Sequence, residues 1–336
     1  MSLHVHRIGP ACTVQDLGRT GYLDHGLSRA GAVDLFALHE GAALLGQDPM
    51  LAALEMAGMG GEFEAQADMV VALTGARMQA SIDGTPVAWN ASHGLAKGQR
   101  LSIGAVQQGV YGYLHVAGGI ATQPFLDSRS SHLVAGIGSP VEAGQTLPVG
   151  GGKAKPGMTL TVEDRFSGGT LRVVESFQSA LFDGDIRARF AATVFRRSQR
   201  ANRMGVKLDS EGEGFAARGQ LNVLSEVIAI GDIQMTGTGE PFILLPECQT
   251  TGGYPRIATV IPCDLARAAQ CPAGAEIRFR FLRLDEAVAA QRQAEAELAR
   301  LPGQVAPLVR DPAGMADLLS YQLIGGVVSA TDEGEK

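Results

Sequence analysis

Residues 241–261 read PFILLPECQTTGGYPRIATVI, two apolar runs separated by a polar segment with paired glycines. Each apolar run has the length and composition of a buried strand, so the stretch predicts two strands joined by a loop. The loop, residues 249–256, carries hydroxyl, amide and guanidinium groups, and its glycines let a ligand approach the main chain. Pro255 stiffens the exit, and Arg256 can hold a carboxylate or phosphate through two parallel hydrogen bonds. The stretch therefore predicts either a ligand-binding loop or a polar hairpin without a ligand.

The same rhythm of short apolar runs and Gly, Asp and Pro turns extends over most of the chain, which contains 44 glycines. This spacing predicts a mainly β protein with a few helices. Regular alternation of strands and helices is missing, which argues against a doubly wound parallel sheet. The first helix has Asp34 as a candidate N-cap and Gly46 as a candidate C-terminal stop. Helices are expected over residues 35–45, 177–191, 285–300 and 311–320.

The segment 148–158 is rich in glycine, lysine and proline and divides the chain almost in half. Matching pieces recur in the same order in the two halves, at a separation of roughly 170–180 residues. We therefore predict two related β-rich modules from an internal duplication, residues 1–150 and 151–284. A C-terminal helical extension, residues 285–336, follows them. Chance similarity between β-rich pieces is the alternative.

The composition narrows the class of protein. The chain has 336 residues, 45% hydrophobic and 19% charged, so a packed core is expected. The net charge of -7 and the lack of a basic stripe argue against nucleic-acid binding. No window approaches the roughly 18 apolar residues of a membrane helix, and no signal-peptide core is present. Four cysteines without a CxxC pair predict reduced thiols in a cytoplasmic protein, without zinc or disulfides.

Generic catalytic motifs are missing from the sequence. There is no GxSxG or HExxH motif, and Gly151-Gly152-Lys153 lacks the Ser or Thr that completes a phosphate loop. We predict that this chain itself binds no metal and no cofactor. If ATP or biotin is used, another chain carries it.

Polar clusters outside the 249–256 loop are further candidates. Gln15, Asp16 and Arg19 lie within five residues of a glycine turn, where they could bind a polar solute or satisfy one another. Asn202 and Arg203 lie beside a glycine, a combination that suits recognition of a carboxylate or an amide.

A third cluster contains Glu226 and Gln234. Glu226 would act as a general base if burial raises its pKa, and a surface glutamate at the end of a strand is the alternative. Gln234 follows the turn that leads back toward the 249–256 loop.

Five motifs follow one another along the chain: TVQDLGR at 13–19, ALTGA at 72–76, VAGGI at 116–120, NRMG at 202–205 and QTTGGYPRIATV at 249–260. Together they resemble the allophanate hydrolase subunit 2 family, also called the biotin-dependent carboxyltransferase A/B domain family, which includes the C subunit of bacterial 5-oxoprolinase. One departure is at residues 28–34, where the family often has Pro-Ser-Gly and this chain has Arg29, Ala30 and Gly31.

The resemblance implies a fold of cyclophilin-like β-barrel modules and a function in a complex. It implies a component of an ATP-dependent 5-oxoprolinase, which opens 5-oxo-L-proline to L-glutamate together with A-like and B-like partner subunits. A carboxyltransferase component of a biotin-dependent carboxylase is one alternative, with urea or a related amide as substrate and biotin on a partner. A non-catalytic regulatory module that antagonises a kinase inhibitor is the other.

The lactam, urea and carboxybiotin substrates share a planar N–C(=O) group, which requires hydrogen-bond donors for the carbonyl oxygen. We expect donors near Gly252 and Gly253 to stabilise oxyanion charge, and at least one of these glycines to have a positive φ. We also expect the loop to share a cleft with Asn202 and either Arg203 or Arg256 to hold a substrate carboxylate. The predicted catalytic residues are Glu226, Thr250 and Thr251. The predicted substrate-binding residues are Gln15, Asp16, Arg19, Asn202, Arg203, Gln234, Gln249, Gly252, Gly253, Tyr254 and Arg256.

Overall fold

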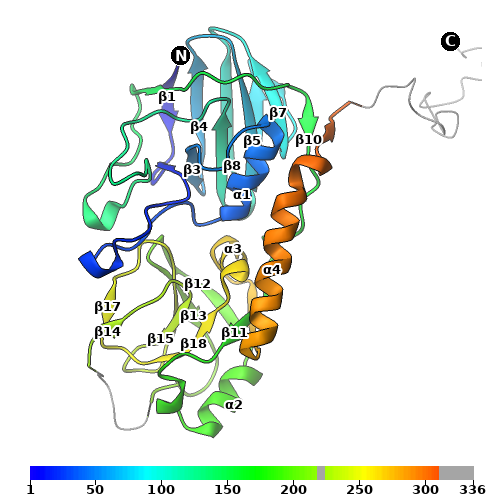
Figure 1. Cartoon of the computed structure of the whole chain (residues 1–336). Coiled ribbons are helices and arrows are strands. Elements are labelled where there is room, and N and C mark those ends of the chain that lie inside the picture. Colours follow the sequence, from blue (N-terminus) through cyan, green and yellow to red (C-terminus); the bar gives the residue numbers. More distant parts are fainter. Residues whose placement is uncertain (218–223, 310–336) are drawn as a thin grey trace, which may run out of the picture.

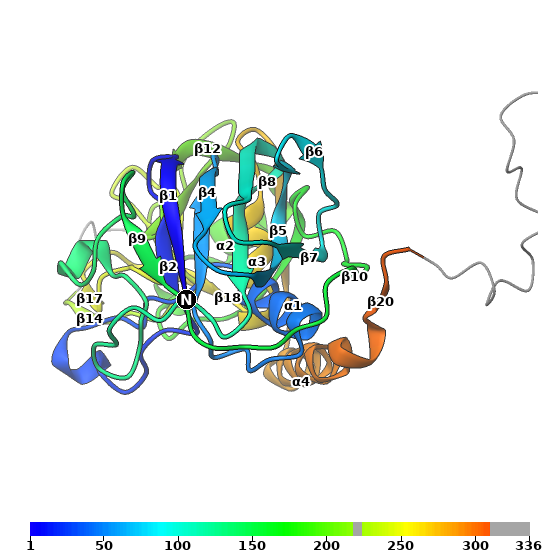
Figure 2. The ribbon, with the colours of Figure 1, turned by 90° about the horizontal axis from the view of Figure 1, so that it is seen from above.

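The computed structural model describes residues 1–217 and 224–309, a mainly β chain with a few helices, as predicted. Two strand-rich modules stack end to end, and α4 (Leu284–Arg300) runs along one side of both (Figure 1). Seen from above, α4 and α1 (Leu35–Leu45) lie on the same side of the molecule (Figure 2). Within the described part of the chain, no helix is long and apolar enough to cross a membrane.

The first module is built on an 11-stranded sheet whose strands pair antiparallel. Its two longest strands, β5 (Met69–Ile82) and β8 (Arg100–Val116), pair along most of their length. Apolar residues of both strands, with Leu54 and Phe63, form the core. The remaining strands are β1 (Ser2–Ile8), β2 (Thr13–Gln15), β3 (Ala53–Ala57), β4 (Gly61–Ala65), β6 (Thr85–Pro86), β7 (Ala91–Leu95), β9 (Thr146–Pro148), β10 (Met158–Thr159) and β20 (Ala306–Pro307).

The first sheet includes residues on both sides of the boundary predicted at residue 150. The short strand β10 pairs with β7 of the first module and with β20, which follows α4. The segment that follows α4 is therefore hydrogen-bonded to the first sheet. The sequence between β10 and α4 forms the second module.

The second module is a closed barrel of seven strands. Phe190, Phe195, Phe215 and Phe279 pack ring against ring in its core, with centroids 4.8–5.5 Å apart. The barrel strands are β11 (Gly169–Val174), β12 (Phe195–Ala201), β13 (Gly205–Asp209), β15 (Asp232–Met235), β16 (Pro241–Leu244), β18 (Arg256–Val260) and β19 (Glu276–Phe281). The internal duplication itself stays a prediction.

The helix α1 has the limits that its sequence predicts. The Asp34 side chain accepts a hydrogen bond from the backbone N–H of Ala37 at 3.2 Å, which satisfies a free donor of the first turn. Gly46 ends the helix in the left-handed conformation, with φ 60°, where a side chain would be strained.

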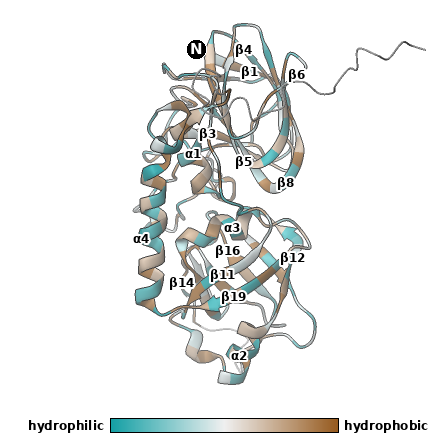
Figure 3. Ribbon diagram, turned by 90° about the vertical axis from the view of Figure 1, so that its right-hand side faces the viewer, coloured by the Kyte–Doolittle hydropathy of each residue, from teal (hydrophilic) through white to brown (hydrophobic). Residues whose placement is uncertain are grey.

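The other helix predictions have mixed outcomes. The helix predicted over 285–300 is confirmed as α4, which buries only Ala287 and Ala294 and alternates between hydrophilic and apolar residues in Figure 3. The stretch predicted as one helix over 177–191 is a 3-10 turn followed by α2 (Gly184–Ala192). The prediction over 311–320 lies outside the described residues, and the short helix α3 (Leu265–Gln270) was not predicted.

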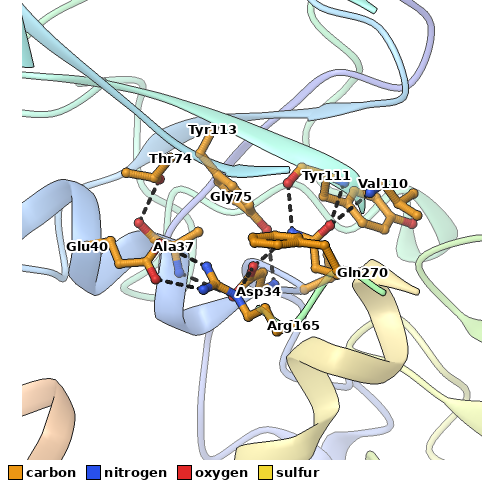
Figure 4. Close-up of polar contacts among 12 residues, drawn as sticks. Asp34, Ala37, Glu40, Thr74, Gly75, Val110, Tyr111, Tyr113, Arg165 and Gln270 are labelled. Carbon is orange, nitrogen blue, oxygen red and sulfur yellow. Dashed lines mark hydrogen bonds and ion pairs between the residues drawn. The ribbon is translucent and has the colours of Figure 1, made fainter. Parts of the chain in front are cut away.

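Buried polar side chains join the two modules. Arg165, in the connecting segment, binds Asp34 at 2.8 Å and forms two bonds of 2.7 and 2.8 Å to Glu40 (Figure 4). Gln270 of α3 accepts hydrogen bonds from the backbone N–H groups of Val110 and Tyr111 and donates to Asp34 (Figure 4). Because every member is paired, these charges are tolerated in a buried interface.

Candidate functional site

The predicted loop 249–256 supplies one strand of a short two-stranded ribbon beside the barrel. Its strand β17 (Thr251–Gly252) pairs with β14 (Glu226–Val227), and Glu226 lies opposite Gly252. Thr250 accepts a hydrogen bond at its carbonyl oxygen from the Ile228 N–H at 2.9 Å. The loop therefore has a fixed backbone, so side chains beside it keep defined positions.

The loop and the Asn202 turn line one cleft with a volume of about 320 Å³. The structure brings together Asn202, Gln234, Gln249 and Tyr254 of the predicted residues. The other wall residues are Arg200, Ala201, Met204, Gly205, Thr236, Phe242 and Leu244. Glu226, Thr250, Thr251 and Arg256 are not part of this wall.

The amide nitrogen of Gln234 is unpaired among the described residues. The Gln234 Oε1 accepts from Gln249 Nε2 at 3.2 Å, but its Nε2 is buried and has no hydrogen-bond partner among the described residues. An unpaired buried donor costs free energy, so a ligand oxygen that accepts from it would gain that amount. The Asn202 Oδ1 accepts from the backbone N–H of Met204 at 2.8 Å, and its amide NH₂ has no hydrogen-bond partner within residues 1–217 and 224–309. The cleft is therefore equipped to bind a carbonyl oxygen.

Position 252 requires glycine because a side chain would not fit there, not because of its backbone conformation. Neither Gly252 nor Gly253 is among the glycines with positive φ, so the predicted left-handed conformation is wrong. A Cβ at Gly252 would lie 2.7 Å from Ile228 Cδ1 and 3.0 Å from Gln234 Nε2. Glycine at this position therefore leaves room for the Gln234 amide.

Arg256 does not face a ligand, contrary to the expectation for a loop arginine. It is the first residue of β18 and is 5% exposed. Its guanidinium contacts Glu226 at 2.6 Å and Asp232 at 3.3 Å, and its Nε donates to Gln178 Oε1 at 3.1 Å. An arginine this deeply buried requires paired acceptors, and here neighbouring segments supply them.

Arg203 lies at the module interface, not in the cleft. Its guanidinium binds Glu55 of the first module, Glu247 at 2.5 Å and the Gly31 carbonyl oxygen at 2.7 Å. Glu247 is two residues before the loop, so this arginine positions the loop relative to the first module. The expectation that Arg203 holds a substrate carboxylate is not supported by this geometry.

Glu226 lacks the burial that its proposed role as a general base requires. Its side chain is 49% exposed and accepts hydrogen bonds from Arg256 and from Gln178 Nε2 at 2.8 Å. Gln178, which the sequence did not indicate, thus bridges Glu226 and Arg256. No local pattern around residue 178 could have shown this, because both partners are distant in sequence.

The Gln15, Asp16 and Arg19 cluster is separate from the cleft. The Asp16 carboxylate accepts from Ser128 Oγ at 2.6 Å, the Arg129 N–H at 2.6 Å and the Gly18 N–H at 2.8 Å. It therefore holds the turn around Ser128 rather than a ligand. Gln15 donates to Thr13 and to the Ser131 carbonyl oxygen. The alternative that these three residues satisfy one another is wrong for Asp16, whose carboxylate binds Gly18, Ser128, Arg129 and Ser130 rather than Gln15 or Arg19.

The described residues contain no group of three His, Cys, Asp or Glu side chains placed for metal binding. All four cysteines are free thiols. Burial raises the pKa of Cys12 to about 11 and that of Cys248 to about 12, which disfavours the reactive thiolate.

The fold and the sequence together place this chain in the class of carboxyltransferase domains. A crystal structure of Kluyveromyces lactis urea carboxylase has the same fold, with a TM-score of 0.80 over 93% of this chain and 31% of that chain, at 22% identity. The chain belongs to the family described as carboxyltransferase domain, subdomain A and B, whose family model matches residues 25–281.

Within this family, the chain is similar to several curated proteins of known name. The chain is 34% identical to the 5-oxoprolinase C subunit of Escherichia coli K12, over 86% of this chain and 94% of that protein. It is 32% identical to the 5-oxoprolinase C subunit of Haemophilus influenzae, over 84% of this chain and 92% of that protein. The crystal structure of TTHA0988 has a TM-score of 0.76 at 32% identity, over 83% of this chain and 55% of that chain. Urea amidolyase of Saccharomyces cerevisiae is 23% identical, and the match covers 81% of this chain and 16% of that protein.

Proposed function

We propose that this chain is one component of an ATP-dependent 5-oxoprolinase complex that opens 5-oxo-L-proline to L-glutamate. The observation that carries the proposal is its identity of 34% and 32% with two curated 5-oxoprolinase C subunits, over 94% and 92% of their lengths. The partners would be the A-like and B-like subunits of such a complex. We assign ATP to one of these partners, because this chain has no complete phosphate loop.

The cleft supports this proposal by its chemistry. A lactam presents one carbonyl oxygen and one N–H in a fixed plane. The buried Gln234 Nε2 is an unpaired donor for the carbonyl oxygen, and the neighbouring Gln249 side chain can orient the ring amide. Thr250 and Thr251 lie on the adjacent ribbon and are retained as candidates for stabilising oxyanion charge.

The test is reconstitution. The chain is co-expressed with the A-like and B-like proteins of the same genome, and glutamate formation from 5-oxo-L-proline and ATP is measured. We expect activity in the complex and none from the isolated chain. Gln234→Leu should lower kcat/KM roughly 10-fold, because one donor to the carbonyl oxygen is lost. Gln293→Leu, on the exposed face of α4, is the control. Equal activity of a complex without this chain would exclude the proposal.

A second candidate is a carboxyltransferase component of a biotin-dependent carboxylase. The family description and the fold shared with urea carboxylase favour it. Biotin would then be carried by a partner. Fixation of labelled bicarbonate into urea, with a biotin carboxylase and a carrier protein added, distinguishes the two. The regulatory alternative stays a prediction.

A further inference from the structure

A second and larger cavity, with a volume of about 480 Å³, lies between the two modules beneath α4. Its walls come from residues 19–36 of the first module, three segments of the second module and the inner side of α4. This volume falls within the range of small-molecule sites, and interfaces between modules are where such sites commonly form. The cavity touches the cleft described above at Gln249, which lines both.

Among the described residues that form the wall, the charged side chains are two arginines, Arg19 and Arg29, and none is a carboxylate. The chain as a whole is acidic, with a net charge of -7, so this local excess of positive charge is not a general property of the protein. A low-dielectric cavity of one sign concentrates ligands of the opposite sign.

Arg29 has a guanidinium without a partner. No hydrogen bond or ion pair joins its side chain to any described residue, and its Nε is buried and unpaired. Burial lowers its pKa, and no neighbouring acid offsets that effect. Arg165, Arg203 and Arg256 are each held by carboxylates, whereas the acceptor for Arg29 is missing among the described residues.

Arg19 is fixed beside it. The Arg19 backbone N–H donates to the Arg29 carbonyl oxygen at 2.8 Å, and its Nη2 donates to the Ser130 carbonyl oxygen at 2.5 Å. Its Nη1 is buried without a partner in the described part of the chain. Two guanidinium groups in one cavity wall thus each carry an unsatisfied buried N–H.

Ser28 adds a third donor. His132 Nδ1 accepts from the Ala135 N–H at 3.3 Å, so the ring proton is on Nε2, which donates to Ser28 Oγ at 2.8 Å. The Ser28 hydroxyl proton is therefore free to point into the cavity. The same tautomer prevents His132 from taking that proton, so the pair is not an activated nucleophile.

We propose that this interdomain cavity is a binding site for a small organic acid, whose carboxylate is held by Arg29, Arg19 and Ser28. The apolar part of the wall, which includes Phe36, Leu265 and Leu298, would pack against the body of the ligand. A carboxylate supplies the paired acceptor oxygens that two guanidinium groups require. The site is a feature of this chain's own residues and does not depend on the proposed reaction.

The test measures binding to the full chain by calorimetry with two matched pairs of probes. The acids are 5-oxo-L-proline and N-acetyl-L-leucine, and their neutral counterparts are 2-pyrrolidinone and N-acetyl-L-leucinamide. We expect the binding of at least one acid to saturate at a ligand concentration of about 10 mM. That acid should bind about 10-fold more tightly than its neutral counterpart. Arg29→Met should remove that preference, whereas Arg292→Met, on the exposed side of α4, should keep it.

The unfolding temperature of Arg29→Met shows whether Arg29 binds a ligand or stabilises the fold. Because Arg29 has no partner among the described residues, Arg29→Met should unfold at the same temperature as the parent chain or higher without ligand, and lose the rise that the acid gives the parent. No saturable binding of either acid, equal binding of acids and neutral counterparts, or unchanged binding to Arg29→Met would each overturn the proposal. The proposed function is tested separately, by glutamate formation in the reconstituted complex. A failure of the binding proposal therefore does not count against the proposed function.

Discussion

Asp34 and Gln270 are 236 residues apart in the sequence and meet through a 2.8 Å hydrogen bond from Gln270 Nε2 to Asp34 Oδ2 (Figure 4). The same carboxylate caps α1 through Ala37 and accepts from Arg165. One buried group therefore fixes the start of a helix, the connecting segment and the second module. Asp34 lies between Val33 and Leu35, which line the cavity between the modules, so the contact is made next to the cavity wall.

Gln270→Leu should lower the free energy of unfolding by about 2–4 kcal/mol, because the Val110 and Tyr111 N–H groups lose their buried acceptor. Chemical denaturation measures this change. Gln293→Leu on exposed α4 is the control, with an expected change within about 0.5 kcal/mol. Equal effects of the two substitutions would contradict the role given to Gln270.

His115 should make the protein lose stability in acid. Burial lowers the pKa of His115 from 6.5 to about 3, and its Nε2 is 2.7 Å from Thr74 Oγ1. Between these two values the unfolded chain binds more protons than the folded chain. This contribution to stability is therefore complete above pH 6.5 and declines as the pH falls toward 3. At about pH 4.5 the loss amounts to about 2–3 kcal/mol.

His115→Gln keeps a donor to Thr74 but does not titrate. Its free energy of unfolding should therefore decline less than that of the parent between about pH 7 and about pH 4.5, by about 2–3 kcal/mol. Denaturant titrations at both pH values give the comparison. Parallel pH profiles for the two proteins would show that His115 is not the group responsible.

Arg256→Met should destabilise the barrel by about 3–5 kcal/mol, because Asp232 stays buried after its cationic partner is removed. This loss of stability differs from the sequence-based expectation that Arg256 holds a substrate carboxylate. Arg196→Met is the control, since that side chain is 62% exposed and its ion pair with Glu276 contributes little. An unchanged denaturation midpoint for Arg256→Met would refute the structural role.

Gly252→Ala should impair activity of the reconstituted complex more than it impairs folding. The new Cβ would displace the ends of two side chains, Gln234 and Ile228, which can move at a cost of about 1 kcal/mol. Gly94→Ala is the matched control, because its Cβ would come no closer than 3.7 Å to another atom. Full activity with Gly252→Ala would remove the Gln234 amide from the site.

Local sequence was sufficient where the deciding interactions are local. Asp34 and Gly46 mark the ends of α1 because a cap and a left-handed stop act within a few residues. The strands on both sides of the 249–256 loop follow from apolar runs of strand length. The family follows from ordered motifs, and its model matches residues 25–281.

The tertiary structure alone decided what the candidate site arginines do. Arg203 and Arg256 have the same chemistry in the sequence, yet one joins the modules and the other ties segments of the barrel together. Arg29 stands out in the sequence only as a departure from the family pattern, and the fold leaves it in a cavity wall with no partner among the described residues. The physical reason is that a guanidinium has the same hydrogen-bonding capacity everywhere. Its availability to a ligand depends on which distant acceptors folding brings within reach.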